Sequence, residues 1–129
     1  MSELAPIVKN ALQELDIDPK DALWYLEVAS TWIMKHKYIE IIGAKKNVVI
    51  DDLVEAETNS AQGVVAIKCY AHLNGQKVIT YGEASPKNNR NSYPYAIAEK
   101  RAIDRAILKL IGIHGFVYSE DELGNFQEK

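Results

Sequence analysis

The sequence predicts an α+β fold in which a three-stranded antiparallel sheet is followed by a long helix that packs on it. The first strand is predicted as two extended segments rich in β-branched residues, 48–50 and 53–58, which Asp51-Asp52 interrupts. The other strands are predicted over residues 64–73 and 76–83, and turn signals separate the three. Asn74-Gly75 joins the last two segments, and this dipeptide favours the type I′ turn of a tight hairpin. Apolar residues then recur at helical spacing over residues 94–111, which predicts a β-β-β-α core.

Two N-terminal helices are predicted before the sheet. Residues 3–15 carry apolar side chains at the spacing of a short amphipathic helix. Asp18 is a suitable cap and Pro19 suits a first helical position, so a second helix is expected over residues 19–35.

Shorter signals complete the order of elements. The apolar run 38–42 fits either a strand or a final helical turn, and residues 85–92 form a polar loop. Gly112 is placed to end the long helix. We therefore expect a single α+β domain over residues 1–118 and an acidic, weakly ordered tail over residues 119–129.

Composition excludes several classes of protein. The chain has 129 residues, of which 47% are hydrophobic and 26% charged, unlike fibrous or wholly disordered chains. No apolar run approaches the roughly 20 residues of a membrane-spanning helix, and no secretory signal is visible. The single cysteine, Cys69, cannot form an internal disulfide and favours a reducing cytoplasm.

The charge is unevenly distributed along the chain. The net charge of −3 taken alone counts against nucleic-acid binding. Residues 1–60, however, carry a net −5, residues 61–110 a net +5, and residues 111–129 a net −3. The basic middle segment predicts a localised anion site, unless the clustering is only a solvated face.

The strand 64–73 offers the first candidate residues. Alternation places its core face on Val65, Ile67, Cys69, Ala71 and Leu73. Lys68 and Tyr70 share the opposite face, where a cation and an aromatic ring could contact phosphate and stack a base. The alternative is an ordinary solvated sheet face.

The last helix offers the second set of candidates. Arg101, Arg105 and Lys109 recur every fourth residue and align on one arc beside the small residues Ala98 and Ala102. Arginine is well suited to phosphate, and no acid stands four residues from either arginine. The alternative is a solvated face. The predicted core face of this helix consists of Ala96, Ile103, Ala106, Ile107, Leu110 and Ile111.

Neighbouring residues extend the predicted nucleic-acid path. Lys87 and Arg90 lie in the polar loop, and Tyr93 and Tyr95 flank the first residue of the helix. The helix N-terminus also attracts phosphate.

Signals for an enzyme are weak, so neither catalytic residues nor a cofactor are predicted. The three histidines lack a metal-ligand spacing; they are His36, His72 and His114. The acids on the first sheet segment could bind a divalent cation, but solvated carboxylates are commoner; they are Asp51, Asp52, Glu55 and Glu57. Lys100 and Asp104 are spaced for an ion pair within the helix.

Three segments resemble single-strand annealing proteins of the Rad fifty-two type, a family that includes phage recombinases such as Sak. The matching segments are Thr80–Ala84, Ala98–Ala106 and Leu110–Gly115, within residues 48–116. The resemblance implies ATP-independent binding and annealing of single-stranded DNA in recombination or repair by an oligomeric ring. It places Arg101 and Arg105 on the DNA-facing helix, with Lys68 and Tyr70 beside the groove.

Oligomer contacts and two alternatives stay open. We expect a homo-oligomer to form through the predicted helix that carries Trp24 and Trp32, or through sheet edges. A double-stranded-RNA-binding domain shares the order of elements, but its cations cluster at the start of the last helix. A small oligomeric scaffold without nucleic-acid binding is the other alternative.

Overall fold

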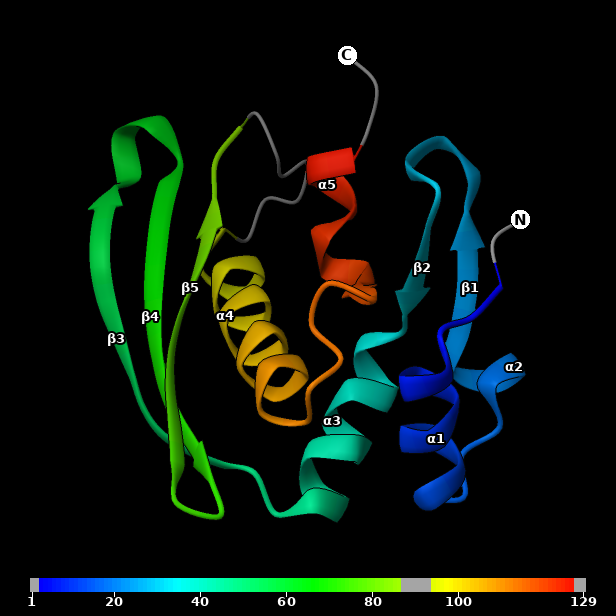
Figure 1. Ribbon diagram of the computed structural model, residues 1–129. Coiled ribbons are helices and arrows are strands. Elements are labelled where there is room, and N and C mark those ends of the chain that lie inside the picture. The colour runs from blue at the N-terminus through cyan, green and yellow to red at the C-terminus, as the bar shows by residue number, and fades with distance from the viewer. Residues whose placement is uncertain (1–2, 87–93, 127–129) are drawn as a thin grey trace.

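Helix α4 (Pro94–Leu110) lies between two three-stranded sheets (Figure 1). The computed structural model describes residues 3–86 and 94–126. The larger sheet has the order β3 (Val49–Asn59), β4 (Val64–Leu73) and β5 (Gln76–Ala84). The smaller sheet has the order β1 (Leu23–Leu26), β2 (Thr31–Met34) and β6 (Val117–Ser119). The remaining elements are α1 (Pro6–Glu14), α2 (Pro19–Ala22), η1 (Glu27–Ala29), α3 (His36–Lys46), η2 (Ser60–Gln62), η3 (Glu120–Glu122) and α5 (Leu123–Phe126).

The larger sheet confirms the predicted antiparallel meander. Asn74 and Gly75 have φ angles of 50° and 83°, which are the positive values that a type I′ turn requires. β3 is one continuous strand rather than the two predicted segments; irregularities after Ile50 and after Glu55 shift its register against β4 without ending the pairing. Asp51 therefore lies within the strand and does not end it.

Helix α4 approaches β5 closely at Gly82. A methyl group on Gly82 would overlap the carbonyl oxygen of Ala98 and the backbone nitrogen of Ala102. The hydroxyl of Thr80 donates a hydrogen bond of 2.7 Å to the carbonyl oxygen of Ala102. Only a glycine on the strand and small residues on the helix permit this packing.

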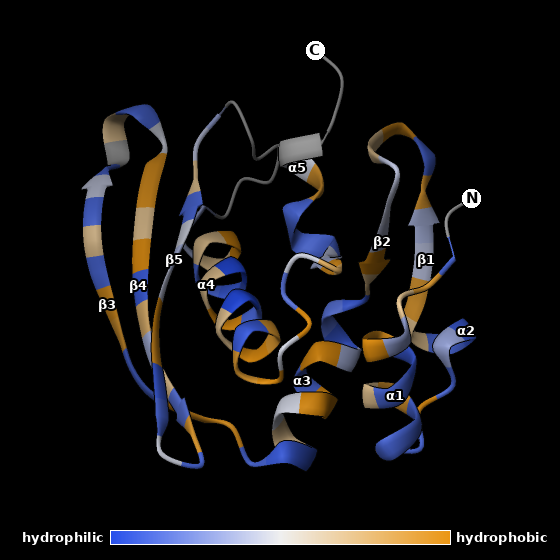
Figure 2. Cartoon of the chain, in the orientation of Figure 1, coloured by the Kyte–Doolittle hydropathy of each residue, from blue (hydrophilic) through white to orange (hydrophobic). Residues whose placement is uncertain are grey.

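The predicted core face of β4 is confirmed, whereas that of α4 is only partly right. On β4, Val65, Ile67, Cys69 and Ala71 are buried and Leu73 is half-buried. On α4, three of the predicted residues are buried, namely Ala106, Ile107 and Leu110, but Ala96 is exposed. Figure 2 shows hydrophobic residues at several points around α4. The helix contributes to two apolar clusters, one with the larger sheet and one with α1 and α3.

The second predicted helix, over residues 19–35, is wrong. Asp18 does cap a helix, since its carboxylate accepts a 2.9 Å hydrogen bond from the backbone N–H of Lys20. That helix, α2, ends at Ala22, and the chain then forms a hairpin in which β1 pairs antiparallel with β2. Ser30 turns the chain with φ 51°. Aromatic and β-branched residues favour strands, and the partner strand β6 comes from the other end of the chain.

Trp24 and Trp32 therefore lie on strands and not on an interface helix. Trp24 is on β1 and is 36% exposed. Trp32 is on β2, where its ring meets the ring of Tyr25 edge-on with centroids 5.2 Å apart. The apolar run 38–42 belongs to α3 and is neither a strand nor a final helical turn.

The expectation of a weakly ordered tail after residue 118 is corrected for the described residues up to 126. Strand β6 pairs in parallel with β2, and Ser119 caps η3 by accepting a 3.0 Å hydrogen bond from the N–H of Asp121. Ser119 and Glu122 are buried. The segment is ordered because its polar groups pair with residues of α4, which lies far away in sequence.

The longest described helix, α4, has 17 residues. No helix in the described part of the chain combines the length and the apolar character that crossing a membrane requires.

Candidate nucleic-acid interface

The larger sheet has one face against α4 and one open face. On β4, the open face carries Val64, Ala66, Lys68, Tyr70 and His72, all of them half-buried. The register of the hairpin puts Tyr81 of β5 opposite Lys68, and Ile79 opposite Tyr70. The open face therefore combines a cation with two tyrosines on adjacent strands.

Lys68 lies over both tyrosine rings. Its ammonium nitrogen is 5.3 Å from the ring centroid of Tyr70 and 5.8 Å from that of Tyr81. These are cation–π distances. The phenol of Tyr70, and then that of Tyr81, raises the pKa of the Lys68 ammonium, which stays charged at neutral pH. We call these three residues the Lys-Tyr platform.

Tyr81 was missing from the residues predicted by sequence, although a signal for it was present. Once the turn Asn74-Gly75 is recognised, the hairpin register follows and sets residue 81 opposite residue 68. Tyr81 is 50% exposed, so its ring is available to a ligand.

A pocket of about 470 Å³ opens beside the platform at the edge of β5. Its lining residues are Ile79, Thr80, Tyr81, Arg105, Lys109, His114, Tyr118 and Glu122. Burial, and then the charges of Lys109 and Arg105, lower the pKa of His114. His114 is therefore a neutral hydrogen-bonding group at physiological pH.

Arg101 does not face solvent as the helix spacing predicted. It is 2% exposed. Its Nη1 donates a 2.7 Å hydrogen bond to the carbonyl oxygen of Glu83, and its Nε donates one of 2.5 Å to the carbonyl oxygen of Asp121. Burial lowers the pKa of this guanidinium. Arg101 thus joins the free edge of β5 to the C-terminal segment.

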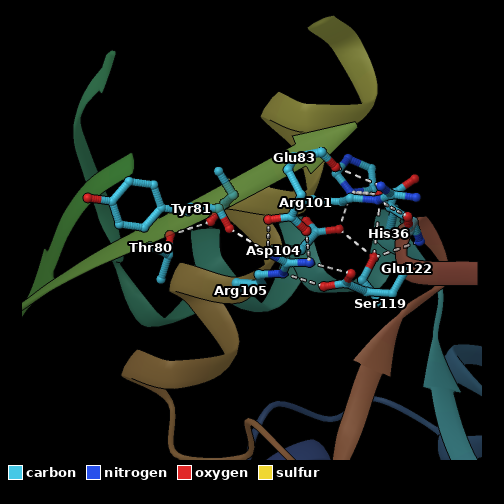
Figure 3. A network of polar contacts seen from close by, with 11 residues as sticks. His36, Thr80, Tyr81, Glu83, Arg101, Asp104, Arg105, Ser119 and Glu122 are labelled. Carbon is cyan, nitrogen blue, oxygen red and sulfur yellow. Dashed lines mark hydrogen bonds and ion pairs between the residues drawn. The ribbon is translucent and has the colours of Figure 1, made fainter. Parts of the chain in front are cut away.

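Arg105 is also engaged within the protein (Figure 3). Its guanidinium donates hydrogen bonds to both oxygens of Glu122, at 2.5 and 2.6 Å, and to Oε1 of Glu83 at 2.9 Å. It also donates a 2.6 Å hydrogen bond to the carbonyl oxygen of Tyr81. Burial alone would lower the pKa of Arg105, but its hydrogen bonds to Glu122 and Glu83 outweigh burial and raise it.

The predicted stripe of cations along α4 is therefore divided. Of its three members, Lys109 is exposed, whereas Arg101 is buried and Arg105 is bound to two carboxylates. Sequence reasoning missed this because the neutralising acids, Glu83 and Glu122, lie outside the helix and not four residues away on it.

The other predicted contacts are separated from the platform or fall outside the described residues. Lys87, Arg90 and Tyr93 lie outside the described residues. The hydroxyl of Tyr95 donates a 2.7 Å hydrogen bond to Glu55 of β3.

The acids of β3 have partners of their own. Asp51 lies 2.8 Å from Nδ1 of His72, and Glu55 accepts from Thr58 at 2.5 Å as well as from Tyr95. The hydrogen bonds from Thr58 and Tyr95 lower the pKa of Glu55, which is ionised at neutral pH. Glu55 lies opposite Ile67, on the α4 side of the sheet, whereas Asp52 lies opposite Tyr70 on the open face. The β3 part of the open face is therefore less favourable for an anion than the part around Lys68.

One polar cluster contains a histidine with potential metal ligands beside it, although the histidines lack a metal-ligand spacing in the sequence and no metal site was predicted. His36 of α3, Asp104 of α4 and Asp121 of η3 bring one ligand atom each within 4.8 Å of one another. Asp104 is fully buried and bonds His36 at 2.8 Å instead of forming the predicted pair with Lys100, which is exposed. Because these residues lie far apart in the sequence, no motif spacing could have indicated a metal site.

No protein-family model, no curated protein and no solved structure matches this chain. The resemblance to annealing proteins stays a prediction.

Proposed function

We propose that the protein binds single-stranded nucleic acid on the open face of the sheet β3–β4–β5. The observation that carries this proposal is the position of Lys68 over the rings of Tyr70 and Tyr81. Aromatic rings on a sheet face stack bases of any sequence, and a nearby ammonium pairs with the backbone phosphate. Tyr81 offers half of its surface for this purpose.

The charge distribution favours a path over β4 and β5. Lys68 belongs to the Lys-Tyr platform, and Lys109 lines the adjoining pocket together with neutral His114. A strand stacked on Tyr81 could therefore place its next phosphates near Lys109. The predicted role of Arg101 and Arg105 in holding phosphate is replaced in this proposal by a structural role, which supports the edge of the platform.

We further propose that the protein anneals complementary strands, and this activity rests on the resemblance to single-strand annealing proteins. An open sheet face that stacks bases leaves their pairing edges accessible, which annealing requires. Fluorescence-quench assays with complementary oligonucleotides, in the absence of ATP, test it: acceleration by the wild type supports annealing, and binding without acceleration limits the protein to binding.

The binding experiment uses a fluorescent oligothymidylate and polarisation titrations at two salt concentrations. Two neutralised phosphates predict an affinity loss of about sevenfold when monovalent salt rises from about 50 to about 200 mM. Lys68→Ala should weaken binding at low salt. Lys37→Ala is the matched control, because Lys37 also lies over a tyrosine, at 5.8 Å from the ring of Tyr38, but on α3.

The outcomes separate the open alternatives. Weaker binding by Lys68→Ala than by Lys37→Ala supports the platform. Preference for duplex RNA over single strands would favour the double-stranded-RNA-binding alternative. No binding by the wild type at low salt would favour a scaffold, for which the exposed apolar residues Val54 and Ile79 offer a docking surface.

A further inference from the structure

A cluster of one histidine and several acids joins three elements on the side of α4 away from the larger sheet. His36 is the first residue of α3, Asp104 lies in the middle of α4, and Asp121 belongs to η3. Figure 3 shows His36, Asp104 and Ser119 converging. The cluster takes no part in the proposed nucleic-acid interface.

The distances within the cluster suit ligands of one metal ion. Nδ1 of His36 lies 2.8 Å from Oδ2 of Asp104 and 3.1 Å from Oδ2 of Asp121. Zinc bonds to nitrogen and oxygen are about 2.1 Å long, so neighbouring ligand atoms around such an ion lie roughly 3 to 3.4 Å apart. A small outward movement of the three side chains would admit the ion.

Asp104 supplies an independent reason to expect a ligand. Its side chain has 0% exposure, and its Oδ1 has no hydrogen-bond partner among the described residues. A buried carboxylate oxygen without a partner is costly, because it has lost its hydration and gained nothing. A cation at Oδ2 would lower this cost, because the charge of a carboxylate is shared by both of its oxygens and the attraction acts on both.

The surrounding charges also favour a cation. Besides Asp104 and Asp121, Glu40 lies 3.2 Å from Nε2 of His36, and Glu120 accepts a 2.7 Å hydrogen bond from the backbone N–H of His36. The nearby Arg101 donates from Nε to the carbonyl oxygen of Asp121 and from Nη1 to the carbonyl oxygen of Glu83. The three carboxylates of Glu40, Glu120 and Asp121 outnumber the two positive charges of Arg101 and a protonated His36, so the site is negative even without the charge of Asp104.

The contacts outside the three candidate ligands follow the pattern of a metal site. When Nδ1 of a histidine binds a metal, its other ring nitrogen commonly donates to a carboxylate, here Glu40. Ligating carboxylates are usually held by hydrogen bonds, and the hydroxyl of Ser119 donates to Oδ2 of Asp104 at 2.6 Å.

We propose that His36, Asp104 and Asp121 bind one divalent transition-metal ion through Nδ1 and one oxygen of each carboxylate. A ligand set of one imidazole and two carboxylates suits Zn²⁺, Mn²⁺ or Co²⁺ better than Ca²⁺, which takes oxygen ligands. The bound ion would hold α3, α4 and η3 together. A fourth position remains for water.

The test uses the full chain after treatment with EDTA and dialysis. Titration with Co²⁺ should produce visible absorption bands that saturate at one ion per chain, and Zn²⁺ should displace the Co²⁺. The melting temperature should rise with Co²⁺. His36→Gln and Asp121→Asn should abolish both the bands and the thermal shift.

His72→Gln is the matched control, because His72 also pairs with an aspartate at 2.8 Å, but lies on the open face of the larger sheet. It should bind Co²⁺ as the wild type does. Asp104 is fully buried, so Asp104→Asn is interpreted only if its circular dichroism spectrum shows a native fold. If it does not fold, the test rests on Asp121→Asn, because the side chain of Asp121 is 12% exposed. Absence of Co²⁺ bands in the wild type, or bands that persist in His36→Gln, would overturn the proposal.

Discussion

Arg105 donates a 2.6 Å hydrogen bond to the carbonyl oxygen of Tyr81, and so ties helix α4 to the strand that presents the Lys-Tyr platform. β5 is an edge strand, and the carbonyl oxygen of Glu83, two residues on, is bound by Arg101. An uncovered edge strand tends to pair with other chains. The two arginines therefore protect this edge and hold η3 against it.

Replacing Arg105 should destabilise the fold. Arg105→Ala would leave the carboxylate of Glu122, which is 8% exposed, without its main cationic partner. Breaking a pair of this kind costs about 3 kcal/mol of the free energy of unfolding. Lys109→Ala, at an exposed position one turn along α4, should change it by less than about 0.5 kcal/mol. Urea denaturation measures both, and equal stability of the two variants would contradict the structural role of Arg105.

Because Arg101 and Arg105 stabilise the fold, substituting them is not a direct test of nucleic-acid binding. The double variant Arg101→Ala/Arg105→Ala would weaken binding through loss of structure even if neither residue touches the ligand. Variants on the open face are therefore the informative ones.

Gly82 should tolerate no side chain. Gly82→Ala would force its methyl group onto backbone atoms of Ala98 and Ala102, which cannot rotate away. We expect a loss of about 3 kcal/mol or more in the free energy of unfolding. Gly43→Ala is a milder comparison, because the nearest atom to its methyl group is the end of the flexible Ile107 side chain, at 2.8 Å. Thermal melts in which the two variants match would argue against the close approach of α4 to β5.

Folding stability in the presence of EDTA should fall as the pH rises from about 6.5 to about 9. The hydrogen bond to Asp104 raises the pKa of His36 to about 9, and burial raises the pKa of Asp104 to about 7. The folded protein therefore holds these protons more tightly than the unfolded chain. The contribution of His36 is fully present below its unfolded pKa and is lost as the pH passes about 9.

The shift at His36 corresponds to on the order of 3 kcal/mol. Melting temperatures recorded across this pH range give the test, with His36→Gln as the reference. The wild type should lose more stability with rising pH than His36→Gln. If the melting temperatures of the wild type and of His36→Gln changed in parallel with pH, His36 would have an ordinary pKa.

Stacking on Tyr81 predicts a difference between two substitutions. Tyr81→Ala should weaken binding of oligothymidylate by roughly tenfold, since a stacked base contributes about 1–3 kcal/mol. Tyr81→Phe keeps the ring and should bind within about twofold of the wild type. Polarisation titrations at constant salt compare them. Equal losses in both variants would point to the hydroxyl group and away from stacking.

Local signals in the sequence were sufficient for the larger sheet. Asn74-Gly75 specifies a hairpin, alternation along residues 64–73 separates its two faces, and Pro94 and Gly112 bracket the helix that follows. These features depend on residues within a few positions of one another.

Features set by distant contacts could not be predicted in this way. The strand character of residues 23–34 depends on pairing with β6, and the burial of Arg101 depends on Asp121 and on the edge of β5. Periodicity shows that residues share a helix face, but not which part of the chain covers that face. The cluster around His36 was missed for the same reason.

The most direct test of the nucleic-acid proposal is an NMR titration of the ¹⁵N-labelled protein with oligothymidylate at low salt. We predict that the largest amide shift changes lie around Lys68, Tyr70 and Tyr81 and extend to Lys109, with small changes along the acidic strand β3. Shift changes concentrated away from the open face, or none at saturating oligonucleotide, would contradict the account.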